Sequence, residues 1–376
     1  MWGLFVQNHA IACSMYADIA VLYVHPVNDI NQKSIEITIT EEPFLTIKVY
    51  YPNTIFAKIP LLNLLFKLFY FFKAYKIGFN QIQKHFGDYN IIHANILTRT
   101  AFIAYFKKLF AGKNYIITEH WSRYLSNVGT YKGFFRKMLT KIVVKHADSV
   151  TTVTENLKNA MQAQQLMNNN YEVVPNVVNS DLFALAEMNS APIKRILHVS
   201  CFEDCSKNIS GLLRVCRRLQ EYRNDFKLIM VGDGIDKTVM EQYAVELGFS
   251  TERIEFLGLL TGKSLVEQFQ MSAFFVMFSN YENFPVVLAE SLICGRPVVA
   301  TKVGGIQEFV DGSNGKLVEA KDESALEGVI VEMLDCYSKY DGLAIRNEAV
   351  LKFSQQAVGK QFHDIYSEVI RKNKPC

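Results

Sequence analysis

Several features that mark particular protein classes are absent from this 376-residue sequence. The net charge is only +3, and no basic stripe is interleaved with aromatic residues, so no nucleic-acid partner is expected. No basic segment precedes the first apolar stretch, which argues against a secretory signal. The longest apolar run, residues 59–72, is too short for a membrane span and contains Lys67. These absences favour a cytoplasmic protein.

Signals for metals and disulfides are also missing. There is no Asp-x-Asp pair, so a metal-bridged diphosphate site is not expected. The seven cysteines are scattered and odd in number, and Cys201 and Cys205 are too isolated for a four-ligand zinc site. Free cytosolic thiols are the favoured interpretation. We predict no metal ligands and no cofactor.

The pattern along the chain is that of an α/β protein. A hydrophobic content of 49% and a charged content of 20% are typical of globular proteins, and the length allows two domains. Apolar strand-like runs alternate with helical stretches through the second half, which predicts a parallel sheet covered on both faces. The predicted strands there are 195–200, 226–231, 253–257, 273–278, 297–301 and 316–318. The predicted helices are 209–222, 235–247, 262–271, 285–294 and one opened by Asp322.

The first half is similar but less regular. Its predicted strands are 19–25, 35–40, 89–93, 115–118 and 150–153, and its predicted helices are 58–85, 99–111 and 132–147. Residues 35–40 alternate with period two, so we expect one exposed face. The chain opens with a helix or its entry loop at Gly3, where a parallel domain should open with a strand. We therefore expect either an upstream start or an N-terminal domain that lacks its first strand.

Glu282 and Glu290 form the most informative motif. Pro285 suits the first position of a helix and Gly295 the position after its end, so Glu282 lies in the preceding loop and Glu290 within the helix. The start of such a helix suits an anion, whereas carboxylates suit hydroxyl groups. Two glutamates at this spacing also occur by chance. Here a predicted strand feeds the loop, and ligands of open α/β sheets bind at strand carboxyl ends. The motif therefore points to a nucleotide sugar.

Six short motifs, in this order and at this spacing, carry a family resemblance. They are Thr118-Glu119-His120, 174–178, Lys207-Asn208, 231–234, 282–290 and 303–308. With them the chain resembles the retaining glycosyltransferases of family 4 (group 1), which have the GT-B architecture of two facing Rossmann-like domains with a cleft between them. The resemblance implies an acceptor-binding domain at 1–178, a nucleotide-sugar-binding domain at 179–353, and a helix at 354–376 that crosses back to the first domain.

The resemblance also assigns roles to individual residues. It implies that His120 faces the reacting sugar, that Lys207 offsets charge on the leaving diphosphate, and that Glu282 contacts the donor hexose. Glu290 would accept hydrogen bonds from the ribose. The implied donor-binding set is Gly3, Lys207, Asn283, Phe284, Pro285, Glu290, Gly304 and Gly305. One departure concerns Cys201, which lies where the family usually has an arginine that binds phosphate.

The implied function is transfer of a hexose from a UDP- or GDP-sugar to a glycan or lipid-linked acceptor, in surface polysaccharide or glycolipid synthesis. Two alternatives stay open: a nucleotide-sugar epimerase or hydrolase, and a non-catalytic nucleotide-sugar-binding subunit or truncated relic. Residues 59–72 and 102–110 are aromatic and flanked by lysines. They fit either core helices whose lysines extend to solvent or weak contact with the inner face of an anionic membrane. A peripheral location on that membrane is therefore the alternative to a purely cytoplasmic one.

Overall fold

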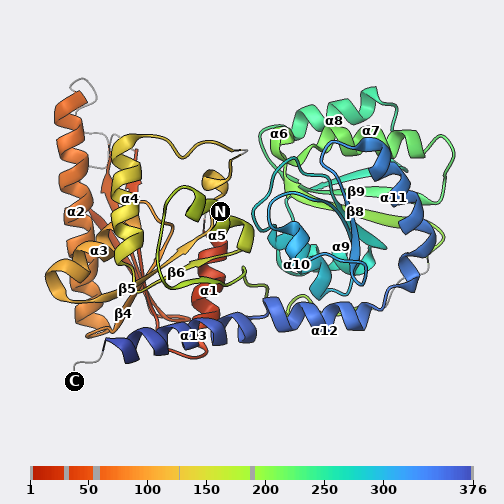
Figure 1. The fold of residues 1–376 in the computed structure, drawn as a ribbon. Helices are drawn as coiled ribbons and strands as arrows, with labels where there is room; N and C mark the ends of the chain where they lie inside the picture. Colours follow the sequence, from red (N-terminus) through yellow and green to blue (C-terminus); the bar gives the residue numbers. More distant parts are fainter. Residues whose placement is uncertain (1–2, 29–33, 54–59, 127, 187–190, 374–376) are drawn as a thin grey trace.

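The computed structural model describes residues 3–28, 34–53, 60–126, 128–186 and 191–373. Figure 1 shows two lobes, with the last two helices running beneath both of them. We call residues 3–173 together with the final helix the N-terminal lobe, and residues 194–353 the C-terminal lobe. The predicted domain boundary at 178/179 lies between the last strand of the first lobe and the first strand of the second. That boundary stays a prediction.

The C-terminal lobe contains a six-stranded sheet with the order β10-β9-β8-β11-β12-β13. All of its pairings are parallel. Every residue of β11 and β12 is buried, as expected for central strands of a sheet covered on both faces. The strands are β8 Lys194–Cys201, β9 Phe226–Asp233, β10 Ile254–Gly258, β11 Phe274–Met277, β12 Val298–Thr301 and β13 Gly315–Val318. The strands predicted for this half are thus confirmed.

Helices cover both faces of this sheet (Figure 1). The Asp322 carboxylate accepts a hydrogen bond from the Ala325 N–H, so the predicted N-cap is confirmed. The helix predicted from Pro285 begins one residue later, with Pro285 as its N-cap. The helices of the lobe are α6 Asp204–Lys207, α7 Ile209–Leu219, α8 Lys237–Glu246, α9 Gly262–Met271, α10 Val286–Ile293, α11 Glu323–Cys336 and α12 Gly342–Phe353, with short 3₁₀ turns η2 Ile306–Glu308 and η3 Tyr337–Lys339.

The N-terminal lobe is built around a parallel sheet with the order β4-β5-β6-β7. The strand at 171–173 and the helix after β6, which have three and nine residues, were not predicted. The elements are β4 Ile91–Asn95, α3 Arg99–Ala111, β5 Asn114–Glu119, η1 Ser122–Tyr124, α4 Phe134–His146, β6 Ser149–Thr152, α5 Glu155–Ala163 and β7 Tyr171–Val173.

A second, three-stranded sheet with the order β1-β3-β2 belongs to the same lobe. It consists of β1 Ala20–Val27, β2 Glu36–Thr40 and β3 Leu45–Pro52, and α2 Pro60–His85 packs against β1 and β3. The strand β3 was not predicted. The expectation that 35–40 has only one exposed face is wrong, because all five residues of β2 are exposed. The helix α2 packs against β1 and β3, and β2 lies at the far edge of this small sheet.

The two ends of the described chain pack together. The helix α1, Leu4–Ser14, confirms the prediction that the chain opens with a helix, and it packs against α13, Gln355–Lys372. The Tyr366 hydroxyl lies 2.7 Å from His93 Nδ1 and 3.3 Å from Cys13 Sγ. The final helix therefore crosses back onto the first lobe, as expected from the resemblance. Among the described residues, the parallel strands of this lobe belong to two separate sheets. That the N-terminal domain lacks its first strand stays a prediction.

Two further predictions concern the membrane and the thiols. Within the described ranges, no helix combines the length and the apolarity that a bilayer span needs. The six cysteines that the structure describes are free, as predicted.

Candidate active site

The predicted residues come from loops that follow parallel strands. His120 follows β5 directly, and the loop 279–285 follows β11 and leads into α10. Lys207 ends α6, which follows β8. Carboxyl ends of parallel strands in one sheet meet at the same edge, so Lys207 and the loop 279–285 come together in the C-terminal lobe.

Lys207 and Glu282 form an ion pair, with 2.5 Å between Nζ and Oε1. Their side chains are only 16% and 9% exposed, and Ser279 Oγ also donates to the same carboxylate oxygen at 2.9 Å. Burial acts to lower the pKa of Lys207, but attraction to Glu282 and Cys201 outweighs it, so the pKa is raised. Lys207 therefore stays cationic, with one carboxylate beside it.

Asn283 joins the two lobes. Its Nδ2 donates to the carbonyl oxygen of His120 at 2.8 Å, and its Oδ1 accepts from Thr154 Oγ1 at 3.0 Å. Both partners belong to the N-terminal lobe. Because Asn283 is adjacent to Glu282 in sequence, these contacts place the Lys207–Glu282 pair at the junction between the lobes.

The His120 ring is held in a partly buried, mostly uncharged setting. Its Nδ1 lies 3.2 Å from Asn176 Oδ1 and its Nε2 lies 3.1 Å from Asn95 Oδ1. Burial, followed by the nearby His9, lowers its pKa well below 6.5, and the Asn176 contact only partly opposes this. A neutral imidazole has one N–H, so it donates to one of the two amide oxygens. His120 thus presents a neutral, oriented ring.

Glu119 organises the chain around His120. Its buried carboxylate accepts from the N–H groups of Leu97, His120 and Trp121 at 2.9–3.0 Å and from the Tyr124 hydroxyl at 3.2 Å. Burial raises its pKa despite these hydrogen bonds. The middle residue of the Thr118-Glu119-His120 motif therefore positions its neighbours.

Gly304 and Gly305 allow the turn after β12 to lie against the loop 279–285. A Cβ at Gly304 would lie 1.9 Å from the carbonyl oxygen of Glu282, and its φ is +57°. A Cβ at Gly305 would lie 2.2 Å from Thr154 Cγ2. Only glycine fits these positions, so the pair supports the placement of Glu282 and Asn283.

Glu290 lies on α10, and its Oε2 atom is buried. Its Oε2 has no hydrogen-bond partner in the described part of the structure, and burial raises its pKa to about 7. A buried oxygen that lacks a donor is unfavourable unless something supplies one. A ligand hydroxyl group is the type of donor that this carboxylate lacks.

The other predicted residues occupy less direct positions. The Phe284 side chain belongs to the core, with its ring 4.9 Å from Phe309 and 5.4 Å from Phe353, so only its backbone is available to a ligand. Gly3, with φ 120°, precedes α1, and Phe5 two residues later packs 4.4 Å from the His120 ring. Gly3 is thereby brought near the junction.

Three residues at the junction were not singled out from the sequence. Glu308 accepts from the N–H groups of Glu155 and Asn156 at 2.8 Å each, so a carboxylate of one lobe caps α5 of the other. Thr154 and Asn95 were also missed. Asn95 ends β4 just as His120 follows β5, so the rule on strand carboxyl ends contained the signal for it.

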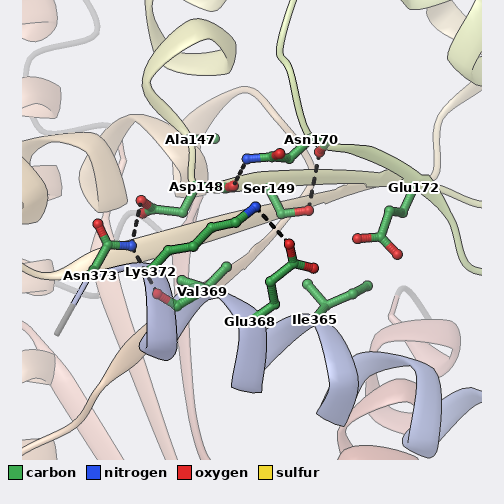
Figure 2. Close-up of a pocket in the computed structure, with 10 residues that line it drawn as sticks. All are labelled: Ala147, Asp148, Ser149, Asn170, Glu172, Ile365, Glu368, Val369, Lys372 and Asn373. Atoms are coloured by element: carbon green, nitrogen blue, oxygen red, sulfur yellow. Dashed lines mark hydrogen bonds and ion pairs between the residues drawn. The ribbon is translucent and has the colours of Figure 1, made fainter.

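A surface pocket shown in Figure 2 lies elsewhere. It is lined by the amino-terminal ends of β6 and β7, near Ser149 and Asn170, and by the end of α13, on which Glu368 and Lys372 form an ion pair one turn apart. His120 follows the carboxyl end of β5, which is the opposite edge of the same sheet. This pocket is therefore separate from the candidate active site.

Two family descriptions match the chain. "Glycosyltransferase Family 4" matches residues 41–182 and "Glycosyl transferases group 1" matches residues 193–336. Together these ranges cover 286 of the 376 residues.

Curated relatives agree with these matches. An uncharacterized glycosyltransferase of Methanocaldococcus jannaschii is 28% identical, over 76% of each chain. The N-acetyl-alpha-D-glucosaminyl L-malate synthase of Bacillus anthracis is 25% identical, also over 76% of each chain.

Solved structures match the fold. Sucrose-phosphate synthase of Thermosynechococcus elongatus superposes with a TM-score of 0.77 at 20% identity, covering 98% of this chain and 94% of that one. HepE of Anabaena, solved in complex with UDP, superposes with a TM-score of 0.68 at 18% identity, covering 85% and 86%.

Two parallel-sheet lobes with the acidic motif at their junction define the class of GT-B glycosyltransferases. The chain belongs to the group 1 glycosyltransferases of family 4, and it is an enzyme that transfers sugars. The family membership favours sugar transfer over the alternatives of an epimerase, a hydrolase and a non-catalytic subunit.

Proposed function

We propose that the protein is a retaining hexosyltransferase. In this proposal it transfers one hexose from a UDP- or GDP-sugar to a glycan or lipid-linked acceptor, in polysaccharide or glycolipid synthesis. The observation that carries it is the chain of contacts Lys207–Glu282, Asn283–His120 at the junction of the lobes. One solved structure of similar fold is described as a complex with UDP and glucose, which supports a nucleotide-sugar donor.

Lys207 supplies positive charge for the diphosphate. Negative charge gathers on the leaving nucleoside diphosphate in the transition state, and a nearby cation stabilises it there. In the ligand-free protein Glu282 holds Lys207 in place. A bound diphosphate shares the ammonium group with Glu282, whose second oxygen then contacts the hexose.

Glu290 binds the ribose. Its unpartnered Oε2 is an acceptor, and the vicinal hydroxyls of a ribose are donors at matching separation. Burial raises the pKa of Glu290, which favours the neutral acid, whereas hydroxyl groups that donate to the carboxylate favour the ionised form. Donor binding and deprotonation of Glu290 are thus coupled.

The surroundings of His120 support retention of configuration. Retention requires attack from the face that the diphosphate leaves, where the departing phosphate oxygen accepts the acceptor's proton. A protein base on the opposite face is then unnecessary. The nearby groups are already engaged: Glu119 accepts four hydrogen bonds, and both His120 nitrogens contact amides.

We also propose that transfer needs no divalent metal and takes place in the cytoplasm. Lys207 can offset the diphosphate charge that a metal would otherwise offset. Six free thiols agree with a reducing compartment. Activity that chelator abolishes and manganese restores would overturn the first of these statements.

The function is tested with the full chain, a panel of uridine and guanosine diphosphate hexoses, and glycan or lipid-linked acceptors. Thermal shift identifies the donor, and proton NMR of the product gives the anomeric configuration. We expect one donor base to be preferred and the configuration to be retained. An inverted product, or a product formed from the donor alone, contradicts the proposal.

Matched substitutions connect the activity to the site. Lys207→Ala is expected to lower turnover, whereas Lys302→Ala, at an exposed lysine of the same lobe, should leave it unchanged. Equal effects of both substitutions would remove Lys207 from the mechanism.

A further inference from the structure

The helix α2 carries an apolar stripe that faces solvent. The exposed residues Leu61, Leu65, Leu68 and Phe72 follow one another at helical spacing, with Leu61 71% exposed. They leave the opposite face of the helix to pack on β1 and β3, where Ala74 and other residues are buried. The helix α2 therefore has two apolar faces, although packing on the sheet requires only one.

The neighbouring helices extend this surface. On α3, Phe110 is 80% exposed, and Phe106 contacts both Phe110 and Phe72 of α2. On α4, which packs against α3, Phe134 and Phe135 are 75% and 77% exposed. The three helices lie on the same lobe, away from the C-terminal lobe (Figure 1). We call their exposed apolar and basic side chains the α2–α4 surface.

The charge on these helices has one sign. Their 52 residues contain eleven Lys and Arg and no Asp or Glu, whereas the rest of the chain has 29 Lys and Arg against 37 Asp and Glu. Among the described residues, only Lys108 of these eleven forms an ion pair, with Asp148. Lys73 lies at the edge of the apolar stripe, over the Phe69 ring. Apart from Lys108, these lysines and arginines have no ion-pair partner among the described residues.

We propose that the α2–α4 surface binds an anionic lipid bilayer, with its apolar side chains in the interface and its lysines and arginines against the headgroups. Large exposed apolar areas on one face are unusual unless they bind something. Exposed aromatic and leucine side chains combined with basic residues only are the chemistry that suits a bilayer surface. Of residues 61–72, the core-helix interpretation fits the inner side, where Tyr70 and Phe71 pack against the core, and does not fit the exposed outer side.

This surface is connected to the candidate active site. Residues 121–133 lead directly from His120 to α4. If the acceptor is lipid-linked, a point that rests on the proposed function, docking brings enzyme and acceptor together. Bilayer binding itself does not depend on that point.

The test is co-sedimentation of the full chain with phosphatidylcholine vesicles, with and without phosphatidylglycerol, at low and high salt. We expect binding to the anionic vesicles that weakens with salt. Two variants, Phe134→Gln/Phe135→Gln and Lys73→Glu/Lys76→Glu, should each lower it about tenfold or more. Unchanged thermal melting of each variant shows that the fold is retained.

Matched controls on the C-terminal lobe carry the same changes. Ile235→Gln/Val245→Gln replaces side chains that are 83% and 74% exposed, and Lys263→Glu/Lys339→Glu reverses two exposed charges. Both should bind vesicles like the wild type. The inference is overturned if the wild type does not bind, or if the controls lose as much binding as the test variants. It is also overturned if the chain dimerises without binding vesicles and the α4 variant abolishes the dimer.

Discussion

The pairing of Lys207 with Glu282 allows stability and turnover to be separated. The perturbation is a set of three variants: Lys207→Met, Glu282→Gln and the combination of both. Each single change leaves one charge in a site where the two side chains are only 16% and 9% exposed. The combined change leaves no charge and roughly preserves the volumes.

The expected magnitudes follow from burial. Removing one partner of a buried ion pair costs about 3–5 kcal/mol of folding free energy. Since Ser279 continues to donate to Glu282, we place Lys207→Met at the lower end, about 3 kcal/mol. For a cooperative unit the size of this lobe, that lowers Tm by about 6–12 °C. The combined variant should recover all but about 1 kcal/mol.

Turnover should not recover with stability. If Lys207 stabilises the leaving diphosphate, its loss lowers kcat on the order of 10²-fold in the single and the combined variant alike. The assays are thermal melting and steady-state transfer with the preferred donor. A combined variant that turns over like the wild type would refute the catalytic role. A Lys207→Met variant as stable as the wild type would refute the buried pair.

Three further predictions concern other residues. Glu290→Gln should raise the free energy of unfolding by about 3 kcal/mol at pH 8 and leave it unchanged near pH 4.5. The reason is that the pKa of Glu290 is about 7 in the folded protein against 4.5 in the unfolded chain, so the wild type loses stability as pH rises through this range. Equal effects of the substitution on melting at both pH values would contradict it. The same substitution should weaken donor binding in calorimetry. Gly304→Ala should destabilise the lobe by more than 1 kcal/mol in thermal unfolding, whereas Gly312→Ala, with open space around it, should not. Equal effects of the two substitutions would exclude the close approach of Gly304 to the carbonyl oxygen of Glu282. Glu308→Ala should loosen the contact between the lobes, which Asn283 also joins, and raise the radius of gyration in X-ray scattering. Glu319→Ala, at an exposed site, should not change it. Unchanged scattering of the Glu308 variant would show that this cap does not help to hold the lobes together.

Local patterns predicted most of the C-terminal lobe. Helix α9 was predicted at its observed bounds, and the cap at Asp322 was identified from residue type alone. Both depend on neighbouring residues, which a sequence displays directly. The strands β3 and β7 were not predicted; β7 has only three residues, whereas β3 has eight and pairs both with β1 and with its sequence neighbour β2.

The candidate site was predictable in its residues but not in its contacts. His120, Lys207 and Glu282 were identified from strand ends and from the family motifs. That Lys207 pairs with Glu282 was not predicted, nor that Asn283 reaches His120, 163 positions away in the chain. Neither contact leaves a periodic signal.

The sequence by itself determined the α/β class, the alternation of strands and helices, and the residue types that suit a nucleotide sugar, because period and capping express local burial and local hydrogen bonding. The tertiary structure alone decided that Glu308 caps a helix of the opposite lobe and that the outer face of α2 stays in solvent. Those outcomes depend on which surfaces meet when the two lobes pack. An apolar residue in a helix has the same identity whether a neighbour covers it or not.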